Sequence, residues 1–145
     1  MKQLLLLFTI LVGVSAANAG AGYVCVSGYL YKPNQTKEYV GIDDCKNASI
    51  RGSFACVSGY LYNPDGNKTY VGTSDCQTSN LGGDYACVSG YLHKPDGSKE
   101  YVGIDDCKVA RIGNGYACVG GYLFKPDGKK EYVGIDDCKA GNYGD

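Results

Sequence analysis

The fold of this chain is decided by the stretch "YACVSGYLHKPDGSKEYVGIDDC", residues 85–107, because the chain contains four versions of it. The eight cysteines are separated by alternating steps of 20 and 11 residues, which gives a strict period of 31. A period of roughly 20 to 50 residues is typical of repeat proteins, in which each copy is one small structural unit. The four copies are Tyr23–Cys45, Phe54–Cys76, Tyr85–Cys107 and Tyr116–Cys138.

Each copy predicts a β-hairpin. In the third copy, the runs "YACVSGYLH" and "KEYVGIDDC" are rich in aromatic and β-branched residues, and they flank the turn sequence Pro95–Gly97. Proline sets φ for the first turn position, and glycine accepts the left-handed conformation that closes the loop. This turn predicts a register in which Tyr91 faces Tyr101. The first copy has Asn-Gln at 34–35 in place of Asp-Gly, so its turn is expected to be less regular.

The faces of the predicted hairpin follow from the alternation of side chains along a strand. Counted from the turn, Cys87 and Cys107 fall on one face together with the tyrosines, and the aliphatic residues fall on the other. We therefore expect each disulfide to lie within one copy. The alternative joins neighbouring cysteines across the spacers and leaves Cys25 and Cys138 unpaired at opposite ends. The expected pairs are Cys25–Cys45, Cys56–Cys76, Cys87–Cys107 and Cys118–Cys138.

The aliphatic face of each copy needs a partner, because an isolated two-stranded hairpin is marginally stable at best. The sequence thus predicts an all-β fold, a tandem array of four disulfide-stapled β-hairpin repeats with a period of 31. A linear array and a compact two-layer structure both satisfy this requirement, with the spacers as connections.

The N-terminus is typical of a secretory signal peptide. Lys2 precedes an apolar run at 4–14, and Ala-Asn-Ala at 17–19 forms a cleavage site of the A-x-A type. The run is shorter than the roughly 20 residues of a membrane-spanning helix. We therefore expect a small secreted, extracellular protein without membrane insertion, whose eight cysteines form disulfides. The expected segments are a signal peptide at 1–19 and repeats with their spacers or tail at 20–53, 54–84, 85–115 and 116–145.

Composition and spacing argue against several functional classes. The chain has 14 basic and 15 acidic residues and no basic patch, so nucleic acid is not an expected partner. Zinc is disfavoured because neighbouring cysteines are at least 11 residues apart. The only histidine, His93, occupies a position that is aromatic in the other copies. No base recurs beside the recurring serines, so we do not expect an enzyme. Those serines are Ser27, Ser58 and Ser89.

Calcium is the one cofactor that the sequence leaves open, because acidic residues precede the second cysteine of each copy. Calcium binds roughly six to eight oxygen atoms. Adjacent residues of a strand point to opposite faces, however, so two neighbouring carboxylates are not expected to converge. We therefore expect no cofactor. The acidic residues are Asp43 and Asp44, Asp75, Asp105 and Asp106, and Asp136 and Asp137.

Two tyrosines recur in every copy and are the candidate binding residues. In one interpretation they form cross-strand pairs that stabilise a thin sheet and cover its disulfide. In the other they form an aromatic surface that binds an extracellular glycan or protein, since tyrosine combines an apolar ring with a polar hydroxyl. The eight residues are Tyr29, Tyr39, Tyr60, Tyr70, Tyr91, Tyr101, Tyr122 and Tyr132.

Three Asn-x-Ser/Thr sequons make Asn34, Asn47 and Asn67 candidate glycosylation sites if the source is a eukaryote. Two of them lie at predicted turns and one lies in a spacer. The third and fourth copies have none.

Residues 91–103, "YLHKPDGSKEYVG", locally resemble the short hairpin repeats of the MORN family, which share an aromatic residue, an Asp-Gly turn and a Tyr-x-Gly sequence. MORN repeats are shorter, typically intracellular and not framed by cysteines. The resemblance implies a similar hairpin and carries no function over.

These observations favour a secreted, non-enzymatic structural or adhesive protein, because near-identical copies multiply one surface and provide no asymmetric site. The alternative is a multivalent extracellular binding module that uses the repeated tyrosine faces, in which linked sites gain avidity. A second alternative is a secreted effector such as a toxin or inhibitor, although the spacers contain no obvious inhibitory loop.

Overall fold

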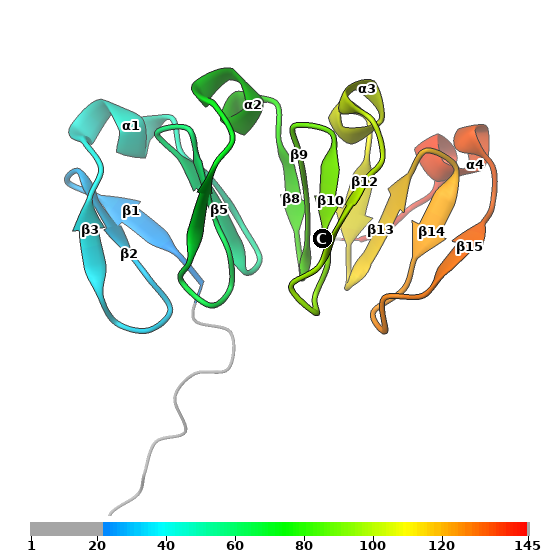
Figure 1. The fold of residues 1–145 in the computed structure, drawn as a ribbon, viewed down its shortest axis with the longest axis horizontal. Coiled ribbons are helices and arrows are strands. Elements are labelled where there is room, and N and C mark those ends of the chain that lie inside the picture. Colours follow the sequence, from blue (N-terminus) through cyan, green and yellow to red (C-terminus); the bar gives the residue numbers. More distant parts are fainter. Residues whose placement is uncertain (1–21, 145) are drawn as a thin grey trace, which may run out of the picture.

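The computed structural model of the protein describes residues 22–144, which form a row of four small β-sheets (Figure 1). The short helices lie along one edge of the row, and the proline-containing turns between the second and third strands of each repeat lie along the opposite edge. The predicted signal peptide at 1–19 lies outside the described residues. Within them, every helix is too short or too polar to cross a membrane.

The third repeat shows the unit. Strands β9 (Tyr85–Val88), β10 (Tyr91–His93) and β11 (Lys99–Tyr101) form an antiparallel meander, and helix α3 (Ile104–Lys108) follows. Tyr91 lies opposite Tyr101, which confirms the predicted register. The predicted loop is also present, because the amide of Lys94 donates to the carbonyl of Ser98 at 2.9 Å.

The other repeats contain the same elements. The first has β1 (Val24–Val26), β2 (Tyr29–Tyr31), β3 (Lys37–Tyr39) and α1 (Ile42–Lys46). The second has β5 (Phe54–Val57), β6 (Tyr60–Tyr62), β7 (Lys68–Tyr70) and α2 (Thr73–Gln77). The fourth has β13 (Tyr116–Val119), β14 (Tyr122–Phe124), β15 (Lys130–Tyr132) and α4 (Ile135–Ala140).

The predicted assignment of side chains to faces is wrong, because the first strand of each expected hairpin is in fact two strands. Ser89 and Gly90 both have positive φ, 55° and 83°, and form a tight turn of the hairpin type between β9 and β10. The chain reverses there, so Leu92 lies opposite Cys87 on the disulfide face. Val88 lies opposite Tyr91 instead. The tyrosine pair is therefore on the face away from the disulfide.

The second expected strand ends early. The amides of Val102 and Gly103 both donate to the carbonyl of Gly90, at 2.8 and 3.1 Å, which closes the strand after Tyr101. Residues 104–108 then form α3, whose first turn carries two acidic residues that suit the positive end of a helix. The acidic pairs thus lie on short helices rather than on strands.

The spacers are more than connections. Each of the three spacers contains a strand that pairs with the first strand of the following repeat, so the second, third and fourth sheets each have four strands. Within residues 22–144 the first sheet has three. The spacer strands are β4 (Ser49–Arg51), β8 (Asn80–Gly82) and β12 (Arg111–Gly113).

The four predicted disulfides are confirmed, and the alternative pairing across the spacers is excluded. Each bond joins cysteines 20 residues apart, with Cα–Cα distances of 5.1 to 5.4 Å. Each ties the first strand of a repeat to the helix that ends it. This linkage fixes the helix against the sheet and confirms the array of disulfide-stapled β-hairpin repeats.

The hydrophobic core lies between repeats rather than inside them. Tyr85, Cys87 and Leu92 on the disulfide face of the third repeat pack against the fourth. The residues they meet there, Ala117, Val119 and Phe124, lie on the opposite face of the next sheet. The same arrangement joins the first repeat to the second and the second to the third. Each sheet therefore contributes one face to the following core and the other to the preceding core, as in other repeat proteins.

Candidate binding surface

Each repeat carries one cross-strand tyrosine pair in edge-to-face geometry. In the third repeat, the ring centroids of Tyr91 and Tyr101 are 5.2 Å apart and their planes are inclined by 68°. Such a pair contributes about 0.5–1.5 kcal/mol beyond the area it buries. The equivalent pairs, Tyr29–Tyr39, Tyr60–Tyr70 and Tyr122–Tyr132, have the same geometry.

All eight predicted tyrosines lie at the surface to some degree. The outer member of each pair, on the edge strand of its sheet, is 63 to 68% exposed. The inner members are about half as exposed, and Tyr60 is partly buried. The rings do not cover the disulfides, which lie on the other face. Binding by these residues remains a prediction. The outer members are Tyr39, Tyr70, Tyr101 and Tyr132.

The outer rings are held in place by the tight turn of their own repeat. A Cβ atom added at Gly90 would lie 2.8 Å from Cε2 of Tyr101, and Gly90 also has a φ of 83°. Glycine is therefore needed here both for the backbone conformation and for the approach of the ring. Gly28 stands in the same relation to Tyr39. The exposed rings are thus positioned by rigid backbone.

A lysine ammonium lies over the inner ring of each pair. The Nζ atom of Lys99 is 4.8 Å from the centroid of Tyr91, within the range of a cation–π contact. Each repeat consequently presents two phenol hydroxyls, one largely open ring and one ammonium group. The equivalent contacts are Lys37–Tyr29, Lys68–Tyr60 and Lys130–Tyr122.

Two of these lysines also connect repeats. Glu100 accepts from Lys94 of its own repeat at 2.8 Å and from Lys130 of the next. Burial opposes the ionisation of the equivalent Glu38, but hydrogen bonds from Lys68 and Lys32 outweigh it and lower the pKa of Glu38. The second repeat has Thr69 at this position, so the second and third repeats lack this ion pair.

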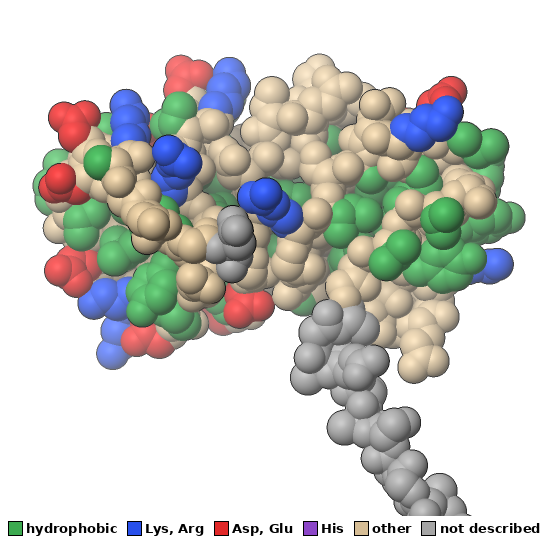
Figure 2. Space-filling view, turned by 180° about the vertical axis from the view of Figure 1, so that it is seen from behind, with side chains coloured by type: hydrophobic (Ala, Val, Ile, Leu, Met, Phe, Trp, Pro, Cys, Tyr) green, Lys and Arg blue, Asp and Glu red, His purple; other side chains and the backbone are tan. Residues whose placement is uncertain are grey.

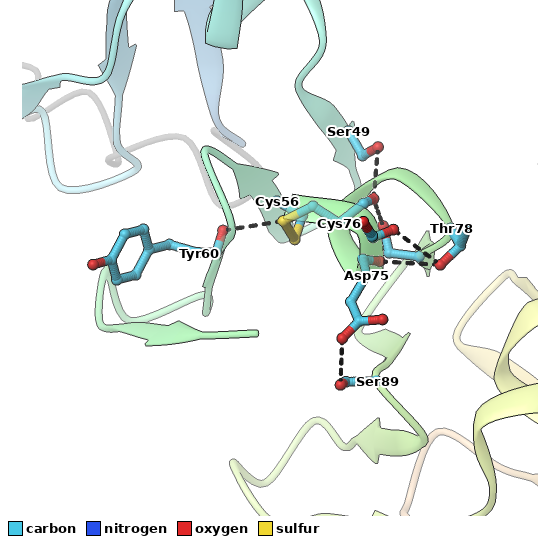
Figure 3. Close-up of a disulfide and its surroundings, with 9 residues drawn as sticks. Ser49, Cys56, Tyr60, Asp75, Cys76, Thr78 and Ser89 are labelled. Atoms are coloured by element: carbon cyan, nitrogen blue, oxygen red, sulfur yellow. Dashed lines mark hydrogen bonds between the residues drawn. A yellow bond between two sulfur atoms is a disulfide. The ribbon is translucent and has the colours of Figure 1, made fainter. Parts of the chain in front are cut away.

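The two carboxylates of an acidic pair point to different partners. Asp44 accepts a hydrogen bond from Ser58 of the next repeat at 2.8 Å, whereas Asp43 pairs with Lys46 on its own helix. Figure 3 shows the matching contact in which Ser89 donates to Asp75, beside the Cys56–Cys76 disulfide. Across residues 22–144, no three His, Cys, Asp or Glu side chains are grouped to hold a metal ion.

His93 lies in an interface between repeats. Burial, reinforced by the charge of Lys99, lowers its pKa to about 4. It lines a cavity of about 250 Å³ together with Phe54 and the turns at 63–65 and 94–97. The imidazole is therefore neutral at physiological pH and borders this cavity together with Phe54.

The three sequon asparagines are exposed, and each makes a local hydrogen bond. Asn34 accepts from the amide of Thr36 at 3.1 Å, and Asn67 donates to Asp65 at 2.9 Å. Asn47 donates to the carbonyl of Asp43 at 3.0 Å. Their glycosylation remains a prediction.

Sequence reasoning missed a hydrogen bond that spans 40 residues. The hydroxyl of Tyr85 donates to the carbonyl of Lys125 at 2.5 Å, and burial raises the pKa of Tyr85 to about 12, so the proton is retained. Tyr23 makes the same bond to the carbonyl of Asn63. The tyrosine at the start of the first and third repeats was the available signal in the sequence. Its hydrogen-bond partner could not be predicted, because that partner is a backbone carbonyl in the next repeat.

No protein-family model, curated protein or solved structure matches this chain. Its function is therefore argued from its own geometry.

Proposed function

We propose that this chain is a secreted, non-enzymatic structural or adhesive protein, and that its adhesive surface is the series of tyrosine pairs. The observation that carries the proposal is the exposure of one tyrosine pair in each of four repeats, always with its outer ring on the edge strand of the sheet. Linked identical sites raise one another's effective concentration, so weak contacts combine into strong attachment.

The chemistry of each pair suits extracellular glycans and proteins. A tyrosine ring offers an apolar face and a hydroxyl, and it loses little conformational entropy on binding because it has two side-chain torsions. The ammonium of the neighbouring lysine adds a hydrogen-bond donor next to the ring. Four disulfides suit a protein that works in an oxidising extracellular space.

Attachment to glycan-coated and protein-coated surfaces, followed by quartz-crystal microbalance, tests the proposal. Variants that carry Tyr→Ser at one, two or all four outer positions should detach progressively faster, by more than tenfold in total, because avidity is lost with each site. The four positions are Tyr39, Tyr70, Tyr101 and Tyr132.

The matched control replaces an exposed apolar residue on a spacer, Val109→Ser, which is 52% exposed. The control should attach like the wild type. Equal attachment by the wild type and the fourfold tyrosine variant would remove the tyrosine pairs as the adhesive surface.

A multivalent recognition module for one glycan class is the second candidate. It is favoured by the arrangement of the two rings and the lysine, which recurs in each repeat, with Lys68 and Lys130 also paired with a glutamate of the preceding repeat. A glycan array separates the two functions. Saturable binding to one class of glycan supports the module, whereas attachment to many unrelated surfaces supports adhesion.

A further inference from the structure

We propose that the two ends of the row bind each other, so that copies of this chain associate head to tail into an open filament. The partner is a second copy of the chain, and the contact is a fifth core of the kind that already joins neighbouring repeats. The proposal concerns the ends of the row and does not depend on what the tyrosine pairs bind.

The first repeat presents the face that every later repeat buries against its predecessor. Val24 and Val26 of β1 are 58% and 51% exposed, while the equivalent Ala55 and Val57 are at most 1% exposed. Tyr31 is likewise exposed, although its counterparts in the second and fourth repeats are buried. Figure 2 shows hydrophobic side chains gathered at this end of the row, where the first repeat lies.

The fourth repeat presents the complementary face. Tyr116 is 38% exposed, whereas Tyr85, at the same position of the third repeat, is fully buried against its successor. Leu123 is partly buried, while the equivalent Leu92 is fully buried. These are the side chains that pack on the Ala, Val and aromatic positions of the next sheet in the existing cores. The exposed residues at the two ends are thus the two halves of one core.

The polar groups at the ends are complementary as well. Asp137 is exposed, whereas the equivalent Asp44 and Asp75 accept hydrogen bonds from a serine of the following repeat. The matching serine of a second copy is its exposed Ser27. In the same way Glu131, which pairs with Lys125 at 2.9 Å, is placed to receive Lys37 of a second copy.

The C-terminal tail is placed to add a fourth strand to the first sheet, which has three strands within residues 22–144. Residues 142–144, Asn-Tyr-Gly, stand at the same distance after their cysteine as the spacer strands β4, β8 and β12. The backbone carbonyl of Tyr143 lies close to Gly113. The carbonyl of Ile112 lies close to Gly82 in the same way. Continuation of the pattern pairs this tail with β1 of the next copy, which becomes the second strand of a four-stranded sheet.

This contact is heterologous, because the face of the first repeat in one copy meets the face of the fourth repeat in another. An assembly of any length therefore keeps one free face of each kind, one at each end. Contacts of this kind extend into open filaments unless the rotation closes a ring. Repeat proteins that remain monomeric usually carry terminal repeats with a polar outer face. The apolar face of β1 departs from that rule, and the fourth repeat provides its partner.

Complementation of blocked ends tests the proposal with the chain from Gly20 onwards, which omits the predicted signal peptide. The wild type should show a mass that rises with concentration in analytical ultracentrifugation. Val26→Asp blocks the first face and Tyr116→Asp blocks the last, so each variant alone should remain monomeric. An equimolar mixture should form a dimer that grows no further, because each variant retains the face that the other has lost.

The control Val109→Asp changes a valine that is 52% exposed on a spacer, and it should assemble like the wild type. Circular dichroism and disulfide mapping establish that each variant is folded. A wild type that stays monomeric up to millimolar concentration overturns the proposal. So does a variant that self-associates while one face is blocked, because that result requires a contact between identical faces.

Discussion

The interface between the second and third repeats differs from the two outer interfaces, although all three use the same backbone. In the outer interfaces a buried tyrosine donates its hydroxyl to a carbonyl of the next repeat, as Tyr85 does to Lys125. The middle interface has Phe54 at this position, which has no hydroxyl. The contrast shows how a repeat protein can vary the contacts of individual interfaces between repeats without altering its fold.

Two further contacts distinguish the middle interface. A glutamate bridges two lysines in each outer interface, but Thr69 replaces it in the middle. A lysine also lies over an aromatic ring of the following repeat in the outer interfaces, as Lys94 does over Phe124. In the middle, His93 replaces that ring and borders the 250 Å³ cavity. The hydrogen bond from Ser89 to Asp75 is retained. Ser53 also donates its amide to Gly83 and its hydroxyl to Asp84 across this interface, at 3.0 and 3.3 Å. Because the middle interface lacks the buried hydroxyl, the bridging glutamate and the lysine–ring contact, we expect it to be the weakest of the three.

The largest expected effect comes from truncation of the first aromatic residue of a repeat. Tyr85→Ala should lower the free energy of unfolding by about 3–5 kcal/mol, because it opens a cavity in a core where Tyr85 is fully buried. Phe54→Ala should cost about 1 kcal/mol less, since no hydrogen bond is lost with it. Urea denaturation measures both. A larger loss at Phe54 would contradict the ranking of the interfaces.

The middle interface should also respond to acid at a higher pH than the outer interfaces, whose ion-paired Glu38 and Glu100 have pKa values lowered from 4.5. His93 has a pKa of about 4 in the folded protein and an ordinary value of 6.5, so the unfolded chain binds more protons between these pH values. Stability should therefore fall as the pH drops from about 6.5 to about 4, by at most about 1.4 kcal/mol per pH unit.

His93→Phe, which copies the fourth repeat, should remove this part of the pH dependence. Thermal unfolding midpoints at several pH values, measured for both proteins, provide the check. Identical pH profiles would show that His93 is not buried as described.

A smaller gain is expected from Phe54→Tyr. The new hydroxyl should reach the carbonyl of Lys94, as the hydroxyls of Tyr23 and Tyr85 reach their partners one repeat ahead. One such hydrogen bond contributes about 0.5–1.5 kcal/mol. The reverse change, Tyr85→Phe, is the matched control and should lose a similar amount. Thermal unfolding should show shifts of opposite sign, and shifts of the same sign would refute the equivalence of the two sites.

Thr69→Glu should have the smallest effect. It places a carboxylate near Lys99, as Glu38 is placed near Lys68, but the supporting lysine of the same repeat is absent because residue 63 is asparagine. A single exposed ion pair contributes about 0.2–1 kcal/mol. The gain should disappear in 1 M salt, where such pairs are screened. A gain that persists in salt would come from another source.

The sequence predicted the features that depend on spacing. The period of the cysteines led to the disulfides, and the Pro95–Gly97 turn led to the pairing of Tyr91 with Tyr101. The tight turn at Ser89-Gly90 was missed because it lacks proline and asparagine and lies inside an aromatic run. Helix α3 was missed because five residues are too few to show a helical period.

The contacts between repeats could not be predicted from the sequence, for a different reason. They join positions 14, 30 or 40 residues apart, as Ser58–Asp44, Lys68–Glu38 and Tyr23–Asn63 do. Such pairs become visible only when the stacking of one repeat on the next is known. The sequence shows that Phe54, Thr69 and His93 differ from the equivalent residues of the other repeats. It does not show that all three lie in one interface.

Native-state hydrogen exchange of β8 and β12 tests the account most directly. Leu81 of β8 belongs to the middle core, whereas Ile112 of β12 packs against the core between the third and fourth repeats. If stability resides in the contacts between repeats and the middle contact is the weakest, the amides of β8 should exchange with a lower opening free energy than those of β12. Equal or greater protection of β8 would contradict the account.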